Sequence, residues 1–196
     1  MRAATLLPRG RTIVRATTAL LAGVAMTLAG PAAGARAQAP CAGSGMAPSA
    51  QTLDAAAGAV VCLVNAHREI HHRGPLTQNG DLARAAGRHS RDMVRRAFFA
   101  HVTPTGAGVS ERMRRGRYIR GSGPWAVGED LAWGTGALST AAATVAAWIA
   151  SPAHNRVLLD ADFREAGVGI AVGLPVTITG GLSGATYTLD VGETGV

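Results

Sequence analysis

The hydrophobic pattern of this chain changes from helical to strand-like near residue 150, and this order limits the folds available to it. Before that point, apolar residues recur every three or four positions, and one such stripe holds Leu82, Ala86, His89, Met93 and Ala97. After it, glycine-bounded runs rich in β-branched residues predict strands. The predicted helices are 52–72, about 81–97 and 140–149, and the predicted strands are 167–172, 176–179 and 186–191. Helices followed by a terminal β-meander indicate an α+β domain built in layers.

The first 37 residues have the three parts of an export signal. Four arginines within residues 1–15 form a basic start, residues 17–33 are apolar and small, and Ala35-Arg36-Ala37 is an A-x-A-like cleavage site. The apolar run is interrupted by Gly30-Pro31 and is too weak for a stable membrane span. We therefore expect a signal peptide at 1–37, a flexible arm at 38–51 and one domain at 52–196. The mature protein is expected to be secreted, either extracellular or periplasmic, without a stable membrane span.

The net charge of +7 belongs mostly to the predicted signal peptide. Cutting after Ala37 removes five of the 19 basic residues and leaves 14 against 12 acidic ones, so the basic signal largely disappears. With only eight aromatic residues and no phosphate loop, the chain is not expected to bind nucleic acid. Residues 101–128 are predicted to be mostly loop, with one short helical turn at 110–115. The arginines within residues 112–117, together with Arg120, could attract anionic envelope polymers or lipid headgroups, or could simply form a solvated face.

The two cysteines can pair once the protein has been exported. A Cys41–Cys62 disulfide would tie the N-terminal arm to the first helix and stabilise the fold by roughly 3 kcal/mol. Two common hydrolase motifs are excluded. In the run from His67 to His71 the glutamate is not adjacent to the first histidine, as a zincin needs, and Gly181-Leu182-Ser183-Gly184-Ala185 lacks the final glycine of a nucleophile elbow.

Three separated segments carry the residues that could do chemistry. His101 follows two phenylalanines and precedes a Thr-Pro-Thr-Gly turn, and Glu129 lies between Gly128 and an acidic–apolar run. His154 follows Trp148 and Ser151-Pro152, where the proline must end a helix. Loop histidines and a carboxylate at the entry to a buried strand can serve as ligands or as general acids and bases. Taken alone, His101 and Glu129 are better explained by structural roles, whereas His154 is the stronger candidate because Pro152 fixes its local backbone. His89, on the apolar stripe, is expected to be a satisfied core histidine.

Together these segments, with Leu63-Val64-Asn65-Ala66-His67-Arg68, resemble the CAP superfamily of cysteine-rich secretory proteins, venom allergens and plant pathogenesis-related proteins. The resemblance runs from about Cys62 to Gly192 and is strongest to the bacterial SCP-like branch. It implies a three-layer α-β-α sandwich in which His101, Glu129 and His154 converge on a central cavity. Such a set could hold Zn²⁺ with one open position, or a His–Glu hydrogen bond could serve only to order the cavity.

The chain departs from the family pattern around these residues. The second cavity glutamate of animal and plant members is replaced by Ser151, and Asp130 stands where an asparagine is usual. Ala153 and Asn155 replace the glycine and arginine that normally flank the histidine. These changes leave His101, Glu129 and His154 in position but make the charge of the cavity uncertain.

The expected function is an extracellular ligand-binding or interaction module whose His/Glu cavity is able to bind a divalent metal such as zinc. Its partner is an unknown extracellular ligand, lipid or protein. A metal-assisted hydrolase acting on peptide or cell wall, with Glu129 as general base, is one alternative, and a lipid-binding protein is the other. The missing second acid at Ser151 weighs against the hydrolase.

Overall fold

The computed structural model describes residues 10–13, 41–178 and 183–195. The predicted signal-peptide cleavage site after Ala37 and most of the segment before it lie outside these residues. Within it, only the strand β1 (Gly10–Ile13) is described, and it pairs in parallel with the strand β3 (Trp125–Thr135).

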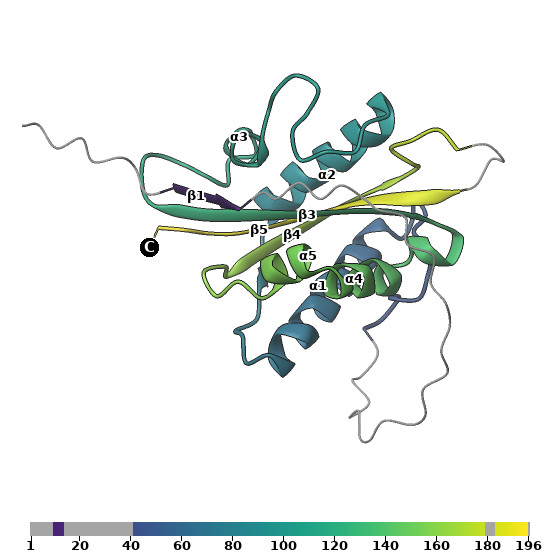
Figure 1. Cartoon of the computed structure of the whole chain (residues 1–196), viewed down its shortest axis with the longest axis horizontal. Helices are drawn as coiled ribbons and strands as arrows, with labels where there is room; N and C mark the ends of the chain where they lie inside the picture. The colour runs from purple at the N-terminus through teal and green to yellow at the C-terminus, as the bar shows by residue number, and fades with distance from the viewer. Residues whose placement is uncertain (1–9, 14–40, 179–182, 196) are drawn as a thin grey trace, which may run out of the picture.

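A five-stranded sheet forms the middle layer of the described structure, in the order β1-β3-β5-β4-β2 (Figure 1). Its centre is antiparallel: β5 (Gly184–Thr194) pairs with β3 on one side and with β4 (Glu165–Val172) on the other. The two-residue β2 (Thr77–Gln78) adds a parallel edge beside β4. The long β3–β5 register brings Glu129 opposite Asp190, so these two carboxylates share one face of the sheet.

Helices cover both faces of the sheet. On one side lie α2 (Gly80–Arg96) and α3 (Val109–Arg115). On the other lie α1 (Leu53–Ile70), α4 (Ala141–Ala150) and α5 (Pro152–Leu158), as Figure 1 shows. A 3-10 turn, η1 (Gly136–Ser139), connects β3 to α4. The predicted α+β fold with three α-β-α layers is confirmed.

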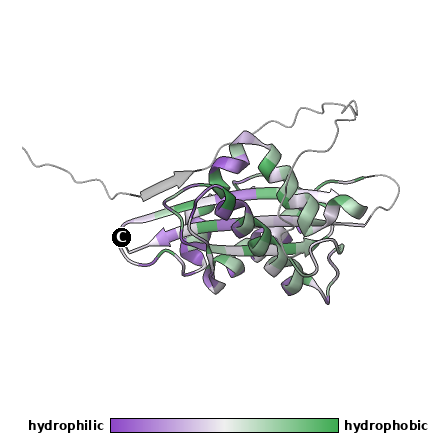
Figure 2. Ribbon diagram, turned by 90° about the horizontal axis from the view of Figure 1, so that it is seen from below, coloured by the Kyte–Doolittle hydropathy of each residue, from purple (hydrophilic) through white to green (hydrophobic). Residues whose placement is uncertain are grey.

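The main core lies between the sheet and the α1–α4–α5 layer. Hydrophobic stretches run along the strands and through the helices that pack on them (Figure 2). Trp148 of α4 is almost completely buried and donates its indole N–H to the Leu131 carbonyl at 3.0 Å, which fastens α4 to β3. A disulfide joins Cys41 to Cys62, so the predicted pairing is confirmed and the arm is tied to α1.

The α2 helix packs unusually close to β4 because two glycines face it. A methyl group on Gly167 or Gly169 would come within 2.1 Å of the α2 backbone. Asn79 caps this helix, since its side chain accepts from the amides of Asp81 and Leu82. The close packing fixes the position of α2, and with it His89, relative to the sheet.

The structure differs from the local predictions at four places. Residues 125–128 belong to β3 instead of the predicted loop, and residues 176–178 form no strand, while position 179 lies outside the described residues. The short β2 was not predicted. Pro152 does follow the end of α4, but it also starts α5 as a first-turn proline, where its missing N–H costs nothing. His154 therefore lies within a helix, not beyond the end of one.

Candidate functional site

Glu129 is the centre of a buried polar cluster on the α2–α3 side of β3. It is 1% exposed, and each of its carboxylate oxygens has its own charged or ring-nitrogen partner. His101 Nδ1 lies 2.7 Å from Oε1, and Arg112 Nη2 donates to Oε2. Burial alone would raise the pKa of Glu129, but the hydrogen bond to His101 and the charge of Arg112 hold it below its ordinary value. Glu129 is therefore an ionised, fully engaged carboxylate.

Arg112 binds both the carboxylate and the loop that carries His101. Its Nη1 donates to the carbonyls of His101 at 2.6 Å and Ala107 at 3.1 Å. One guanidinium thus joins α3, the loop after α2 and the sheet. The sequence interpretation left Arg112 in a basic run that could be a solvated face, whereas the structure buries it under the His101 loop.

Asp190 and His89 extend the cluster, and burial favours the uncharged form of each. Burial and the negative charge of Glu129 raise the pKa of Asp190 well above its ordinary value. Burial lowers the pKa of His89 to about 4, although Glu129 lies 4.0 Å from its Nε2. Both shifts favour the uncharged form of the group, and the Glu129–Arg112 pair is the ionic centre of the cluster.

His89 was predicted to be a satisfied core histidine, and only half of that holds. Its Nε2 lies 3.0 Å from the Ala100 carbonyl and must be the protonated nitrogen, because a carbonyl only accepts. Its Nδ1 is buried without a hydrogen-bond partner. His89 therefore belongs to the polar cluster as well as to the apolar stripe of α2.

His154 meets this cluster at a small cavity beside β3. The cavity has a volume of about 20 Å³, enough for about one water molecule. It is lined by His101, Glu129, Asp130, Ala153, His154, Arg156 and Val157. The three residues singled out in the sequence thus line one space, although they come from a loop, a strand and the helix α5.

His154 is held in its neutral form at this cavity. Burial and the nearby His101 lower the pKa of His154, and its Nδ1 is buried without a hydrogen-bond partner. Asp130, on the cavity wall, has a pKa raised well above its ordinary value by burial and by Glu129. This shift favours the protonated form of Asp130, in which its charge would match that of the usual asparagine, whereas Glu129 on the same wall stays ionised.

The donor set fits a two-histidine site better than the three-ligand set considered from sequence. Within residues 10–13, 41–178 and 183–195, no group of three or more His, Cys, Asp or Glu side chains is arranged to hold a metal ion. Glu129 has both oxygens occupied by His101 and Arg112, which makes it a partner that orients His101. The Nε2 of His101 and the ring of His154 are the nitrogens left for a ligand.

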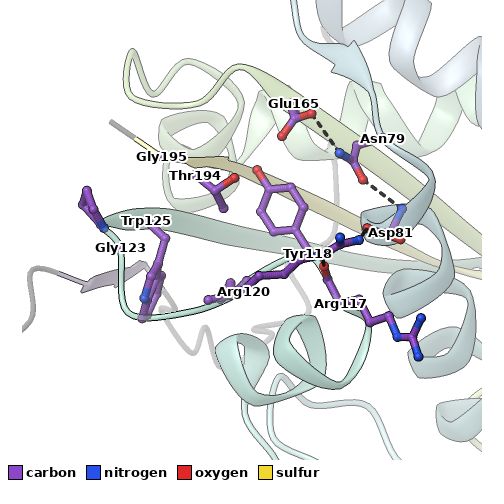
Figure 3. Close-up of a pocket in the computed structure, with 12 residues that line it drawn as sticks. Asn79, Asp81, Arg117, Tyr118, Arg120, Gly123, Trp125, Glu165, Thr194 and Gly195 are labelled. Atoms are coloured by element: carbon purple, nitrogen blue, oxygen red, sulfur yellow. Dashed lines mark hydrogen bonds and ion pairs between the residues drawn. The ribbon is translucent and has the colours of Figure 1, made fainter.

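A second, wider cavity of about 350 Å³ lies at the start of β3 and contains none of the predicted site residues. Figure 3 shows the phenol of Tyr118 between Glu165 and the loop that leads into Trp125. The Tyr118 ring lies over Gly192, where a methyl group would come within 2.7 Å of it. Asn79 donates to Glu165 at 2.8 Å, so the acidic wall of this cavity is already hydrogen-bonded.

The comparison with known protein families agrees with this geometry. The profile of the "Cysteine-rich secretory protein family", CAP, matches residues 61–174, which is more than half of the chain. The chain belongs to the CAP family. The matched range includes His101, Glu129 and His154, and it ends just after β4.

Relatives and solved structures place this CAP domain with bacterial proteins. Two curated proteins of Bacillus subtilis (strain 168) match this chain. "Uncharacterized membrane protein YlbC" is 27% identical, over 57% of this chain and 30% of its own length. "Uncharacterized protein YkwD" is 31% identical, over 56% of this chain and 40% of its own length. A crystal structure of an extracellular protein containing an SCP domain from Bacillus anthracis str. Ames is 26% identical with a TM-score of 0.58, covering 72% of this chain and 41% of that one. The chain thus spans less than half the length of these relatives.

No helix in the described part of the chain is both long enough and apolar enough to cross a bilayer. The family match and the structural similarity identify a CAP domain of the bacterial SCP-like kind. His101, Glu129 and His154 line a polar cavity in this domain.

Proposed function

We propose that this protein acts outside the cytoplasm as a ligand-binding or interaction module, in which His101 and His154 hold a divalent cation such as zinc. The observation that carries the proposal is the presence of two imidazole rings at one small cavity. His101 is oriented by Glu129 through its Nδ1, and His154 has a buried Nδ1 without a partner. Metal-binding histidines commonly donate their second ring N–H to a carboxylate in this way.

The chemistry of the donor set fits zinc with two protein ligands. Imidazole nitrogens suit zinc, and the remaining coordination positions of such an ion would be open to water or to an oxygen or nitrogen of a partner molecule. In this arrangement Glu129 fixes the ring and tautomer of His101, and Arg112 keeps Glu129 ionised. The module would thus recognise its extracellular partner partly through a cation it holds in place.

The same contacts argue against the hydrolase alternative. A general base works best with a pKa near the working pH and needs a free oxygen within reach of the proton it removes. Both oxygens of Glu129 are occupied, and its pKa is held low by His101 and Arg112 against the opposing effect of burial. Ser151 supplies no second carboxylate. A ligand-binding role is the simpler use of this cavity.

Zinc titration by calorimetry, with elemental analysis of the purified protein, tests the proposal. We expect about one zinc per chain in the wild type and loss of that ion in a His101→Ala/His154→Ala variant. The matched control is His71→Ala/His72→Ala, which removes two exposed histidines at the end of α1. The control should bind zinc as the wild type does.

Equal zinc binding in the two double variants would refute the proposed ligands. Absence of zinc binding in the wild type would also refute the proposal and would leave the His101–Glu129 hydrogen bond with a purely structural role in the cavity.

A further inference from the structure

A second polar site lies on the outer side of α2, against α3 and the loop between these helices. This basic pocket has a volume of about 400 Å³ and is lined by six arginines and one carboxylate, Asp92. The arginines are Arg88, Arg91, Arg95, Arg96, Arg112 and Arg115. Figure 1 shows the loop between α2 and α3 rising beside both helices. None of these residues except Arg112 takes part in the proposed cation site.

Two arginines of this pocket have no ion-pair partner among the described residues. Asp92 is shared by Arg95 at 2.6 Å and Arg96 at 3.3 Å. Arg112 is matched by Glu129, and Arg115 by Glu111 outside the pocket. Arg88 and Arg91, both exposed on α2, have no ion-pair partner among the residues that the structure describes. A concave wall with one sign of excess charge attracts counter-ions strongly.

Two buried polar atoms of the lining are also without partners. They are Nε of Arg112 and Nδ1 of His89. His89 is 1% exposed, and because its Nε2 donates to Ala100, its Nδ1 can only accept a hydrogen bond. The site thus combines guanidinium donors with one buried acceptor. A ligand with several anionic oxygens and a hydroxyl group matches this set.

We propose that the basic pocket binds a phosphate group, carried either by a small soluble phosphate ester or by a lipid headgroup. Guanidinium groups bind phosphate oxygens in bidentate pairs, and more than one arginine can engage the same group. A carboxylate, with two oxygens, would use fewer of the donors on this wall. A glycerol-linked phosphate also carries hydroxyl groups, which could donate a hydrogen bond to the unpartnered Nδ1 of His89.

The test uses glycerol phosphate, inorganic phosphate and two kinds of vesicle, phosphatidylcholine alone and phosphatidylcholine with phosphatidylglycerol. The pocket variant is Arg88→Gln/Arg91→Gln, which removes the two arginines that have no ion-pair partner among the described residues and keeps good helix formers on α2. The control, Arg84→Gln/Arg73→Gln, removes two exposed charges outside the pocket. Melting curves of both variants check that the fold is intact.

We expect glycerol phosphate to bind the wild type and the control with the same affinity. Its affinity for the pocket variant should be lower by about tenfold or more. Binding should also weaken as salt is added, since exposed charges are screened. Preference for phosphatidylglycerol vesicles that depends on Arg88 and Arg91, without binding of glycerol phosphate, would identify a lipid headgroup as the source. Binding of glycerol phosphate without vesicle preference would identify a soluble ester.

Two results would overturn the proposal. One is equal affinity of the pocket and control variants for every probe. The other is no binding of either phosphate compound by the wild type together with no preference between the two vesicles.

Discussion

Gly169→Ala should be among the most damaging single-methyl changes in this domain. Gly169 lies in β4 directly under α2, and a methyl group there would stand 2.1 Å from the Gly87 amide nitrogen and 2.2 Å from the Ala86 carbonyl carbon. Both are backbone atoms of a helix, so no side chain can rotate away. To restore an ordinary contact of at least 3.4 Å, α2 must move outward by more than 1 Å.

That movement would loosen the whole α2–sheet interface. Leu82 and Met93 are fully buried on this helix, and Ser90 donates to the Gly169 carbonyl at 2.9 Å. Overpacking in a core costs typically 1–3 kcal/mol when side chains can adjust, and a backbone clash should reach or exceed the upper end. We expect a loss of about 3–4 kcal/mol in the free energy of unfolding, or roughly 10 °C in Tm.

Urea unfolding of the wild type and the variant, followed by far-UV circular dichroism, measures this loss. The control is Gly58→Ala in α1, where a methyl group meets nothing within 4 Å. Because alanine favours a helix over glycine, this change should stabilise the protein by about 0.5–1 kcal/mol. A loss below about 1 kcal/mol for Gly169→Ala would refute the claim that the backbone of α2 packs directly against the backbone of β4 at Gly169.

Three further predictions concern the disulfide and the buried polar cluster. Cys41→Ala/Cys62→Ala should lower the free energy of unfolding by roughly 3 kcal/mol, and a reducing agent should then have no further effect on urea unfolding. Arg112→Met should cost about 3–5 kcal/mol because it leaves the buried Glu129 carboxylate without its arginine partner at Oε2, and a loss under 1 kcal/mol would mean that Glu129 is not ionised. His89, with a folded pKa of about 4 against 6.5 unfolded, stays neutral in the folded state. Stability should therefore fall as the pH drops from about 6.5 to 4, by up to about 3 kcal/mol, and His89→Gln should flatten this part of the curve relative to the wild type.

The helices were predictable because their signals are local. The 3.6-residue spacing of apolar positions in α1, α2 and α4 lies within single segments, and α1 and α4 were predicted to within about two residues at each end. The strand β3 was predicted only in part. Both its faces are covered by helices, and its middle carries Glu129-Asp130, so it lacks the alternating pattern of a half-exposed strand. Its first four residues follow a Gly/Arg-rich segment and read as loop.

The site shows the same division between local and long-range information. Residue type and the family resemblance pointed to His101, Glu129 and His154, which do line one cavity. Nothing local distinguishes Arg112 from the other arginines of its run, because its role depends on Glu129, 17 positions away on another element. His89 likewise looked like a core residue, and only the packing of α2 on the sheet brings it to 4.0 Å from Glu129.

Arg112 connects the two proposed sites, and its contacts explain why they can be tested separately. Its Nη2 serves the Glu129 carboxylate, its Nη1 holds the carbonyl of His101, and its side chain also lines the basic pocket. Because Glu129 already neutralises its charge, a phosphate in that pocket must depend mainly on Arg88 and Arg91. Replacing those two exposed arginines leaves every contact of the His101–Glu129 pair in place, so zinc binding and phosphate binding can each fail while the other holds.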